Sequence, residues 1–300
     1  MNPCRQTELH LRRLLLTALM LGLPASASGQ PVDLWVENQW RLCRINVDGT
    51  EFKVLDETPG MRCGSPVWSP DGQRIAYDVS DVSKESEDVQ LAVIRPDGSD
   101  RQLLGTGAIP CWSPDGSMIL CRSGGKCVMN GDGTGRETLP GFAVSLRWFP
   151  RGNRIASMAG SGLALFDLET GAERLISTSP HHVQIGYDIS PDGSRICYGS
   201  LRGGLCVATL DYRSLEAGHA KVEQLVPEGV GYHASWSPDG KRIVFAWQRQ
   251  PSDLTQLYIY DTESRGEPTL VPGLDLTRHN GNVDWSPDGK TLVFSQSALE

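Results

Sequence analysis

The fold is decided by the stretch Trp236-Ser237-Pro238-Asp239-Gly240-Lys241-Arg242-Ile243-Val244-Phe245. Pro238 fixes φ near the value that the first central position of a tight turn requires, and Asp239 suits the second. Gly240 tolerates the positive φ that reverses the chain. Because short apolar runs flank this turn on both sides, the stretch predicts a β-hairpin.

The same unit occurs six times along the chain. Five copies contain Ser-Pro-Asp-Gly and one contains the degenerate Phe-Pro-Arg-Gly; their prolines are Pro70, Pro114, Pro150, Pro191, Pro238 and Pro287. The residues two positions before these prolines are Trp68, Trp112, Trp148, Ile189, Trp236 and Trp285. Successive prolines lie 44, 36, 41, 47 and 49 residues apart. A period in this range, with several short strands per unit, is typical of propeller blades.

We therefore predict an all-β fold, a six-bladed β-propeller of four-stranded antiparallel blades. The last repeat supplies only two strands, within residues 285–296, and the two strands expected at 40–46 and 51–55 precede the first repeat. Pairing of these N-terminal and C-terminal strands would complete one blade and close the ring. A further strand expected at 32–37 has no evident place. We expect no helix after the leader that is described next.

The first residues match a secretory signal peptide. Arg5, Arg12 and Arg13 give a positive start, an apolar run of ten positions follows at 14–23, and an Ala-x-Ala cleavage site ends at Ala27. The apolar run is too short for a bilayer span, which needs about 20 residues. The predicted organisation is a signal peptide over residues 1–27 and one propeller domain over residues 28–300. The mature protein is thus expected to be periplasmic or secreted, without membrane insertion after cleavage.

The chain is acidic, with a formal net charge of −8. Removal of residues 1–27 takes away three arginines and one glutamate, which changes this charge to −10. A negative balance argues against nucleic acid as a partner, because the phosphate backbone attracts basic proteins. We expect protein partners, no nucleic acid and a monomeric chain.

Seven of the eight cysteines lie beyond the leader, and an exported protein meets an oxidising compartment. Two pairs flank short turns and are candidate disulfides: Cys121 with Cys127, and Cys197 with Cys206. Adjacent antiparallel strands bring cysteines within reach only at some positions, so each pair could equally be reduced. The odd number leaves at least one thiol without an intramolecular partner.

The repeated Ser-Pro-Asp-Gly units, with Asp-Gly turns such as Val47-Asp48-Gly49-Thr50 and Pro96-Asp97-Gly98-Ser99 between them, resemble the TolB-type, WD-repeat-like propeller repeat. The resemblance covers about residues 40–296 and implies the fold far more than any function. Two features of larger relatives have no counterpart in this sequence. TolB proteins carry an α/β domain ahead of the propeller, and the related peptidases carry a Gly-x-Ser-x-Gly nucleophile.

Candidate binding residues lie ahead of the fourth, fifth and sixth repeats, where loops would gather at the mouth of the central channel. They are His182, Tyr232, His233, His279 and Asn282. Three imidazoles at one mouth would suit a transition metal, and some TolB-like propellers are lyases with a histidine-rich metal site. The histidines stand nine, five and eight residues before their prolines, so they occupy unlike positions along the strands. Polar mouth residues without a metal therefore fit the spacing better.

The repeated aspartates of Ser-Pro-Asp-Gly are assigned to turn chemistry and the repeated tryptophans to the core between blades. The sequence thus predicts an exported, non-enzymatic scaffold that binds proteins or ligands through the channel mouth and two long loops, at 80–88 and 212–221. We expect no catalytic residue, metal or cofactor. The alternative is a metal-dependent polysaccharide lyase or hydrolase that uses His182, His233 and His279.

Overall fold

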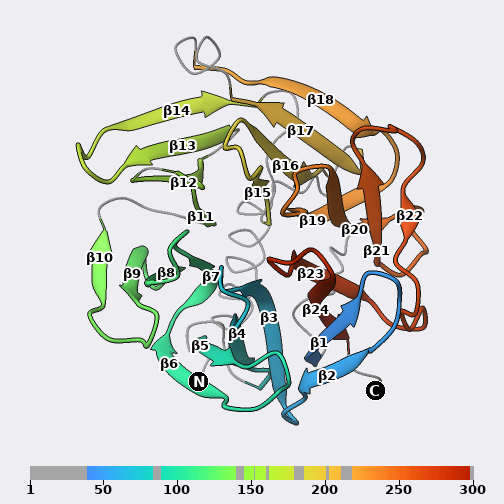
Figure 1. The fold of residues 1–300 in the computed structure, drawn as a ribbon, viewed down its shortest axis with the longest axis horizontal. Helices are drawn as coiled ribbons and strands as arrows, with labels where there is room; N and C mark the ends of the chain where they lie inside the picture. Colours follow the sequence, from blue (N-terminus) through green and yellow to red (C-terminus); the bar gives the residue numbers. More distant parts are fainter. Residues whose placement is uncertain are drawn as a thin grey trace, which may run out of the picture. The chain divides into compact units, whose positions relative to one another are not determined.

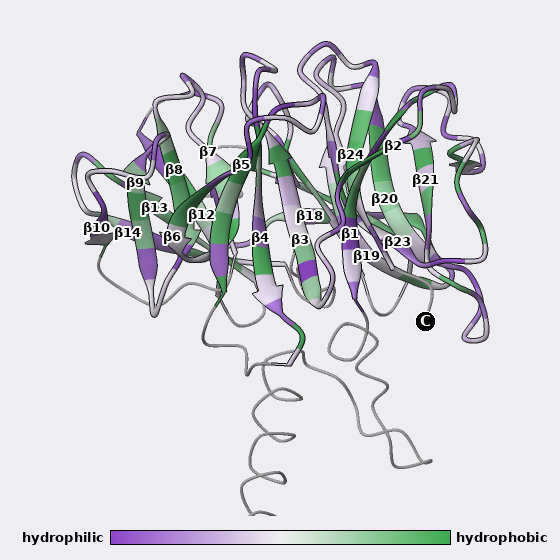
Figure 2. Cartoon of the chain, turned by 90° about the horizontal axis from the view of Figure 1, so that it is seen from below, coloured by the Kyte–Doolittle hydropathy of each residue, from purple (hydrophilic) through white to green (hydrophobic). Residues whose placement is uncertain are grey.

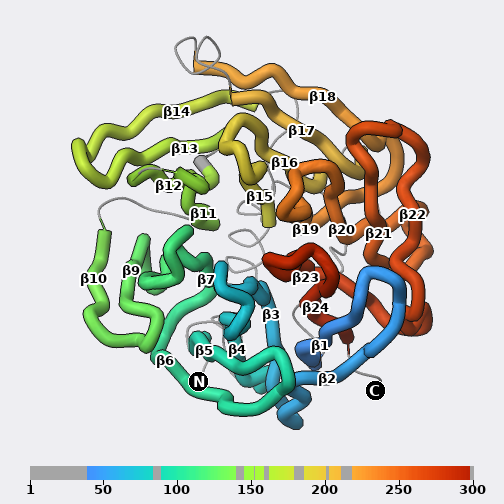
Figure 3. The backbone as a smooth tube through the Cα atoms, viewed as in Figure 1, coloured from blue at the N-terminus to red at the C-terminus, as the bar shows by residue number. Residues whose placement is uncertain are grey.

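The computed structural model describes residues 39–83, 89–139, 145–151, 153–159, 162–178, 186–200, 203–210 and 218–297. These residues form β-strands and turns and contain no helix, in agreement with the all-β prediction. The sheets are set around a common centre, with one edge strand of each facing inward and one facing outward (Figures 1 and 3). The fold is a β-propeller. The strand expected at 32–37 lies outside the described residues, as do parts of both long loops.

Four sheets are separate four-stranded blades, each a run of antiparallel neighbours. Two of them are β7 (Ala108–Trp112), β8 (Met118–Arg122), β9 (Lys126–Asn130), β10 (Glu137–Leu139), and β11 (Leu146–Trp148), β12 (Arg154–Ala159), β13 (Gly162–Asp167), β14 (Glu173–Ser177). The other two are β15 (Asp188–Ile189), β16 (Arg195–Gly199), β17 (Leu205–Thr209), β18 (Lys221–Val226), and β19 (Val230–Trp236), β20 (Arg242–Gln248), β21 (Gln256–Asp261), β22 (Thr269–Leu270).

The remaining eight strands form one continuous sheet. They are β1 (Trp40–Asn46), β2 (Lys53–Asp56), β3 (Met61–Trp68), β4 (Ile75–Asp81), β5 (Gln90–Ile94), β6 (Gln102–Thr106), β23 (Asn280–Trp285) and β24 (Thr291–Ser297). The prediction of six separate four-stranded blades is therefore wrong, because only four such blades are present. A parallel bridge between Trp40 and Arg62 joins β1 to β3 and merges the strands on either side into one sheet.

The predicted pairing of the two ends of the propeller is confirmed. Strand β1 runs antiparallel to β24 over seven residue pairs, from Trp40 opposite Ser297 to Asn46 opposite Thr291. Strand β2, which follows β1 directly in the chain, also pairs with it in antiparallel fashion. The first described strand is thus held on one side by the last, and hydrogen bonds between residues about 250 positions apart close the ring.

Each Ser-Pro-Asp-Gly turn is fixed by hydrogen bonds within the motif, as the copy around Pro238 illustrates. The Ser237 hydroxyl donates to Oδ1 of Asp239 at 2.5 Å, and the backbone N–H of Lys241 donates to the same oxygen at 3.0 Å. Gly240 has φ of 68° and closes the turn by donating its N–H to the carbonyl oxygen of Ser237. The assignment of these aspartates to turn chemistry is confirmed.

Neighbouring turns also contact one another around the ring. A Cβ placed on Gly240 would meet the Pro191 ring at 3.6 Å, and one placed on Gly289 would meet Pro238 at 3.7 Å. Arginines reinforce these contacts between repeats: the Arg195 guanidinium lies 4.4 Å from the ring centre of Trp236. The motif therefore serves twice, because it forms its own turn and packs against the next one.

The core lies between the sheets. In β20, Val244 and Ala246 pack on one side, whereas Ile243, Phe245 and Trp247 pack on the other. Burial on both faces was expected from the unbroken apolar runs of these strands. In Figure 2, hydrophobic residues lie along the strands and hydrophilic residues gather in the connecting loops.

Candidate functional site

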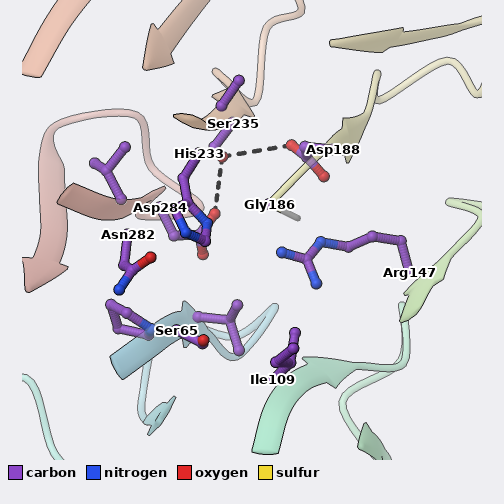
Figure 4. A pocket seen from close by; sticks show the side chains of 13 residues that line it. Ser65, Ile109, Arg147, Gly186, Asp188, His233, Ser235, Asn282 and Asp284 are labelled. Atoms are coloured by element: carbon purple, nitrogen blue, oxygen red, sulfur yellow. Dashed lines mark hydrogen bonds between the residues drawn. The ribbon is translucent and has the colours of Figure 1, made fainter. Parts of the chain in front are cut away.

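The innermost strands place two sets of side chains toward the centre of the ring. Residues three positions before each repeat proline are Val67, Cys111, Arg147, Asp188, Ser235 and Asp284. Residues five positions before it are Ser65, Ile109, Ser145, Gly186, His233 and Asn282. All of these except Cys111 and Ser145 line one cavity (Figure 4). Pro66, Ala234 and Val283, which lie between these two positions, line the cavity as well.

A β-bulge shapes four of these strands at the cavity. In β3, β7, β19 and β23, two inner-strand residues oppose a single residue of the neighbouring strand, and the position five before the proline is one of the two. The backbone φ is positive at Ser65, Ile109 and Asn282. Bulges commonly redirect side chains at functional sites. Ile109, with φ of 55°, is the most strained, because β-branched residues rarely adopt this conformation.

Two aspartates in this cavity bind the backbone of the next inner strand. Oδ2 of Asp188 accepts the N–H of Trp236 at 2.8 Å, and Oδ2 of Asp284 accepts the N–H of Trp68 at 2.9 Å. The Ser235 hydroxyl lies between them, 2.8 Å from Asp284 and 3.4 Å from Asp188 (Figure 4). A hydroxyl has one proton, so Ser235 can donate to only one carboxylate at a time.

Burial raises the pKa of both carboxylates. For Asp284, burial and then the negative charge of Asp188 raise the pKa to about 6. The pKa of Asp188 also rises through burial, against the lowering effect of the Arg147 guanidinium. The pKa of His233 changes in the opposite direction. Burial, together with the charge of Arg147, lowers this pKa to about 3, so the imidazole is neutral at pH 7. When both carboxylates are ionised, they and the one guanidinium give the cavity a net charge of about −1.

Arg147 and Asn282 have unused hydrogen-bonding capacity. Within the described part of the chain, the one hydrogen bond from the Arg147 guanidinium goes to the carbonyl oxygen of its neighbour Leu146, at 2.9 Å. Asn282 is 8% exposed, and its Oδ1 has no hydrogen-bond partner among the described residues. Buried polar atoms are nearly always paired, so an unpaired one points to a missing water or ligand.

The structure brings together only part of the predicted site. His233 and Asn282 line the cavity. Tyr232 is turned away: its ring packs against a core cluster, and its hydroxyl lies 3.4 Å from Oε1 of Gln248. His279 does not line the cavity, since its Nδ1 accepts the N–H of Thr255 at 3.1 Å beside the Trp40 ring. His182 lies outside the described residues.

The metal-dependent alternative gains no support from the geometry. The two described histidines of the proposed set have different surroundings, as given above. Among the residues with described positions, no group of three or more His, Cys, Asp or Glu side chains could hold a metal ion.

Sequence reasoning overlooked Arg147, Asp188, Ser235 and Asp284. The predicted site was defined by residue type, chiefly histidine, rather than by position in the repeat. Counting back three and five residues from each proline would have selected these side chains. It would also have placed His279, eight residues before Pro287, outside the cavity.

The two candidate disulfide pairs differ in geometry. Cys121 lies directly opposite Cys127 on β8 and β9. Cys197 lies opposite Val207, and it packs into a different core cluster from Cys206. The structure therefore brings the first pair together and places the second on opposite faces of one sheet. All seven cysteines of the described region are buried free thiols.

Comparison with known proteins agrees with this architecture. No protein-family model matches the chain. A protein assigned as TolB from Agrobacterium tumefaciens has a similar structure, with a TM-score of 0.63 and 20% identity over 88% of this chain and 99% of that chain. A chain of the nidogen–laminin complex is similar with a TM-score of 0.58 and 10% identity, over 77% of this chain and 93% of that chain. Hydrazine synthase of Kuenenia stuttgartiensis is similar with a TM-score of 0.51 and 18% identity, over 79% of this chain and 74% of that chain.

All three similarities lie below 25% identity and establish the fold alone. The chain is a β-propeller whose structure is similar to that of a TolB protein, which confirms the expected resemblance at the level of fold. The described residues include no helix long and apolar enough to cross a membrane.

Proposed function

We propose that this chain is an exported β-propeller scaffold that binds a protein partner at the mouth of its central cavity. Rigid scaffolds commonly carry binding sites where their loops converge, and propellers do so around the central channel. The proposal rests on binding alone and involves no covalent step.

The observation that carries this proposal is the difference between the turns and the cavity. The turn sequence stays nearly constant from copy to copy, whereas the position three before the proline holds Val, Cys, Arg, Asp, Ser and Asp. Packing does not require charges there, because burying Arg147, Asp188 and Asp284 costs free energy that apolar residues would not. Retention of such charges in a cavity favours a role in recognition.

Photo-cross-linking tests this proposal. Glu228 is exposed on the loop that enters β19, and Lys241 lies at the opposite end of that strand. A photoreactive amino acid at position 228, irradiated in an extract of the source cells, should give a discrete cross-linked species. The same probe at position 241 is the matched control. Equal products from both positions, or none from position 228, would contradict partner binding at this mouth.

Export is tested separately by sequencing the N-terminus of the mature protein. The leader pattern predicts cleavage after Ala27, so the mature chain should begin at Ser28 and be recovered outside the cytoplasm. A cytoplasmic chain that retains residues 1–27 would contradict this part of the proposal.

A further inference from the structure

We propose that the cavity between β19, β23 and β11 binds a primary ammonium group. This inference rests on the proposed function, because the ammonium group would be the tip of a lysine side chain of the partner or, as a second source of the same chemistry, a small free amine. The argument uses the unpaired oxygen, the charge, the size of the cavity and the number of acceptors.

The unpaired oxygen marks a place for a donor. Oδ1 of Asn282 is buried and without a partner in the described structure, and it faces the cavity (Figure 4). The asparagine is held at φ of 48°, in a bulge that opposes Phe294, so the backbone itself directs this side chain inward. A buried acceptor without a donor is costly, and a ligand that supplies an N–H would remove that cost.

The charge favours a cation over a neutral donor. Asp188 and Asp284 line the same cavity as Asn282, and Arg147 neutralises only one of the two carboxylates. His233 is neutral and adds no positive charge. Charge-assisted hydrogen bonds are roughly twice as strong as neutral ones, so the remaining carboxylate favours a positively charged donor.

The size of the cavity excludes most larger ligands. The volume open to the centre of a water molecule is about 20 Å³. About 10–15 Å³ suffices for one water molecule, and an ammonium group is similar in size to water. Arg147, Asp188, His233 and Asp284 each retain some exposure to solvent, so the cavity can be reached from outside.

The number of acceptors favours ammonium over a metal ion. An ammonium group donates three hydrogen bonds, and Asn282, Asp284 and Asp188 supply acceptor oxygens in the same cavity. Calcium takes six to eight oxygen ligands, and magnesium requires octahedral geometry. The described residues offer no group suited to a metal ion.

A titration with methylammonium chloride tests the inference. The protein is labelled with ¹⁵N-tryptophan, and the backbone amides of Trp68 and Trp236 are followed by NMR, since they donate to Asp284 and Asp188. Both signals should shift with saturable dependence on methylammonium. Potassium chloride and tetramethylammonium chloride, at the same ionic strength, should not reproduce the shifts because neither donates a hydrogen bond. No saturable shift, or equal shifts with all three salts, would overturn the proposal and leave a bound water as the partner of Asn282.

Paired variants make the test specific to the cavity. Asn282→Gly removes the oxygen but tolerates the positive φ, and it should weaken methylammonium binding about tenfold or more. Asn282→Asp keeps the oxygen, also tolerates this φ and adds a charge, so it should bind more tightly. Asp284→Asn should weaken binding, whereas Glu263→Gln, the same charge change at an exposed site, should not. Equal affinities in all variants would contradict the assignment.

A blocked Gly-Lys-Gly peptide and its Nζ-acetyl-lysine analogue separate the two sources. Binding of the first but not the second assigns the ammonium group to a lysine side chain. Binding of methylammonium without either peptide assigns it to a free amine. Partner cross-linking at position 228 without any amine binding would leave the proposed function in place and overturn this inference alone.

Discussion

Asp239 and Asp284 belong to neighbouring repeats, but they occupy opposite electrostatic environments. Asp239 lies in an exposed turn, where hydrogen bonds from Ser237 and Lys241 lower its pKa. Asp284 lies in the central cavity, where burial and Asp188 raise its pKa to about 6. The sign of the pKa shift shows whether hydrogen bonding or loss of solvation dominates at each position. The turn aspartates therefore stabilise the fold, whereas the cavity aspartates are held at a cost.

Loss of a turn carboxylate should have the largest effect on stability. Asp239→Ala removes the carboxylate that accepts from the fully buried Ser237 hydroxyl and from the Lys241 N–H, although the Arg242 carbonyl oxygen, 3.0 Å from this hydroxyl, remains as an acceptor. We expect the free energy of unfolding to fall by about 2 kcal/mol, measured by urea denaturation. Asp239→Asn keeps an acceptor oxygen and should lose less. A change within about 0.5 kcal/mol for the alanine variant, as for an ordinary surface substitution, would contradict the structural role of the turn.

Removing the charge of Asp284 from the cavity should raise the free energy of unfolding, and the size of this gain should depend on pH. Because the pKa of Asp284 is higher in the folded protein than in the unfolded chain, the folded protein binds more protons between about pH 4 and 6, and its stability falls as pH rises through that window. The Asp284→Asn variant has no carboxylate at this position, so its stability does not fall in this way as the pH rises. We expect the variant to be more stable than the wild type by about 2 kcal/mol at pH 8, with the difference fading near pH 4.

Asp288→Asn, in the turn of the same repeat, is the control for this pH dependence. Hydrogen bonds from Ser286 and Lys290 lower the pKa of Asp288, so this variant should be less stable than the wild type at pH 7. That difference should shrink as the pH falls through the lowered pKa. If Asp284→Asn and Asp288→Asn showed the same sign at pH 8, the contrast between turn and cavity would be wrong.

Relief of backbone strain beside the cavity should have a smaller effect. Ile109 is held at φ of 55°, a conformation that asparagine tolerates far better than a β-branched residue. Ile109→Asn should raise the free energy of unfolding by about 0.5–1 kcal/mol, measured by chemical denaturation. Ile109→Val remains β-branched and should gain nothing. A gain for valine equal to that for asparagine would mean that side-chain volume, rather than strain, sets the stability here.

The last prediction is that the imidazole of His233 does not titrate near neutral pH. Burial lowers the pKa of His233 to about 3, so its imidazole should stay neutral from pH 5 to 8. Its ring-proton NMR signals should therefore not shift across this range. A midpoint near the ordinary histidine value of about 6.5 would show that the cavity is far better solvated than its geometry indicates.

The fold could be predicted from sequence because its signals are local. The Pro-Asp-Gly turn depends on residues within five positions, and the unbroken apolar run after it indicates a strand buried on both faces. The joining of the strands around β1 and β3 could not be predicted in this way. It depends on one bridge between Trp40 and Arg62, two residues set by the packing of separate strands rather than by a motif.

The cavity was predicted only in part for a similar reason. His233 and Asn282 were selected by residue type and happen to occupy the bulge that faces inward. Asp188 was missed because its role depends on the N–H of Trp236, 48 residues later in the chain. Repeats offer a partial remedy: constant positions report the fold, and positions that vary between copies on one strand face indicate where a site can form.

The pairing of β1 with β24 sets an order of events during synthesis. Residues 40–46 are synthesised about 250 residues before their partner at 291–297. Until that segment arrives, β1 keeps an open edge that can pair with other chains. The ring therefore closes only after residues 291–297 have been made, and a protein that lacks this strand would be prone to aggregate.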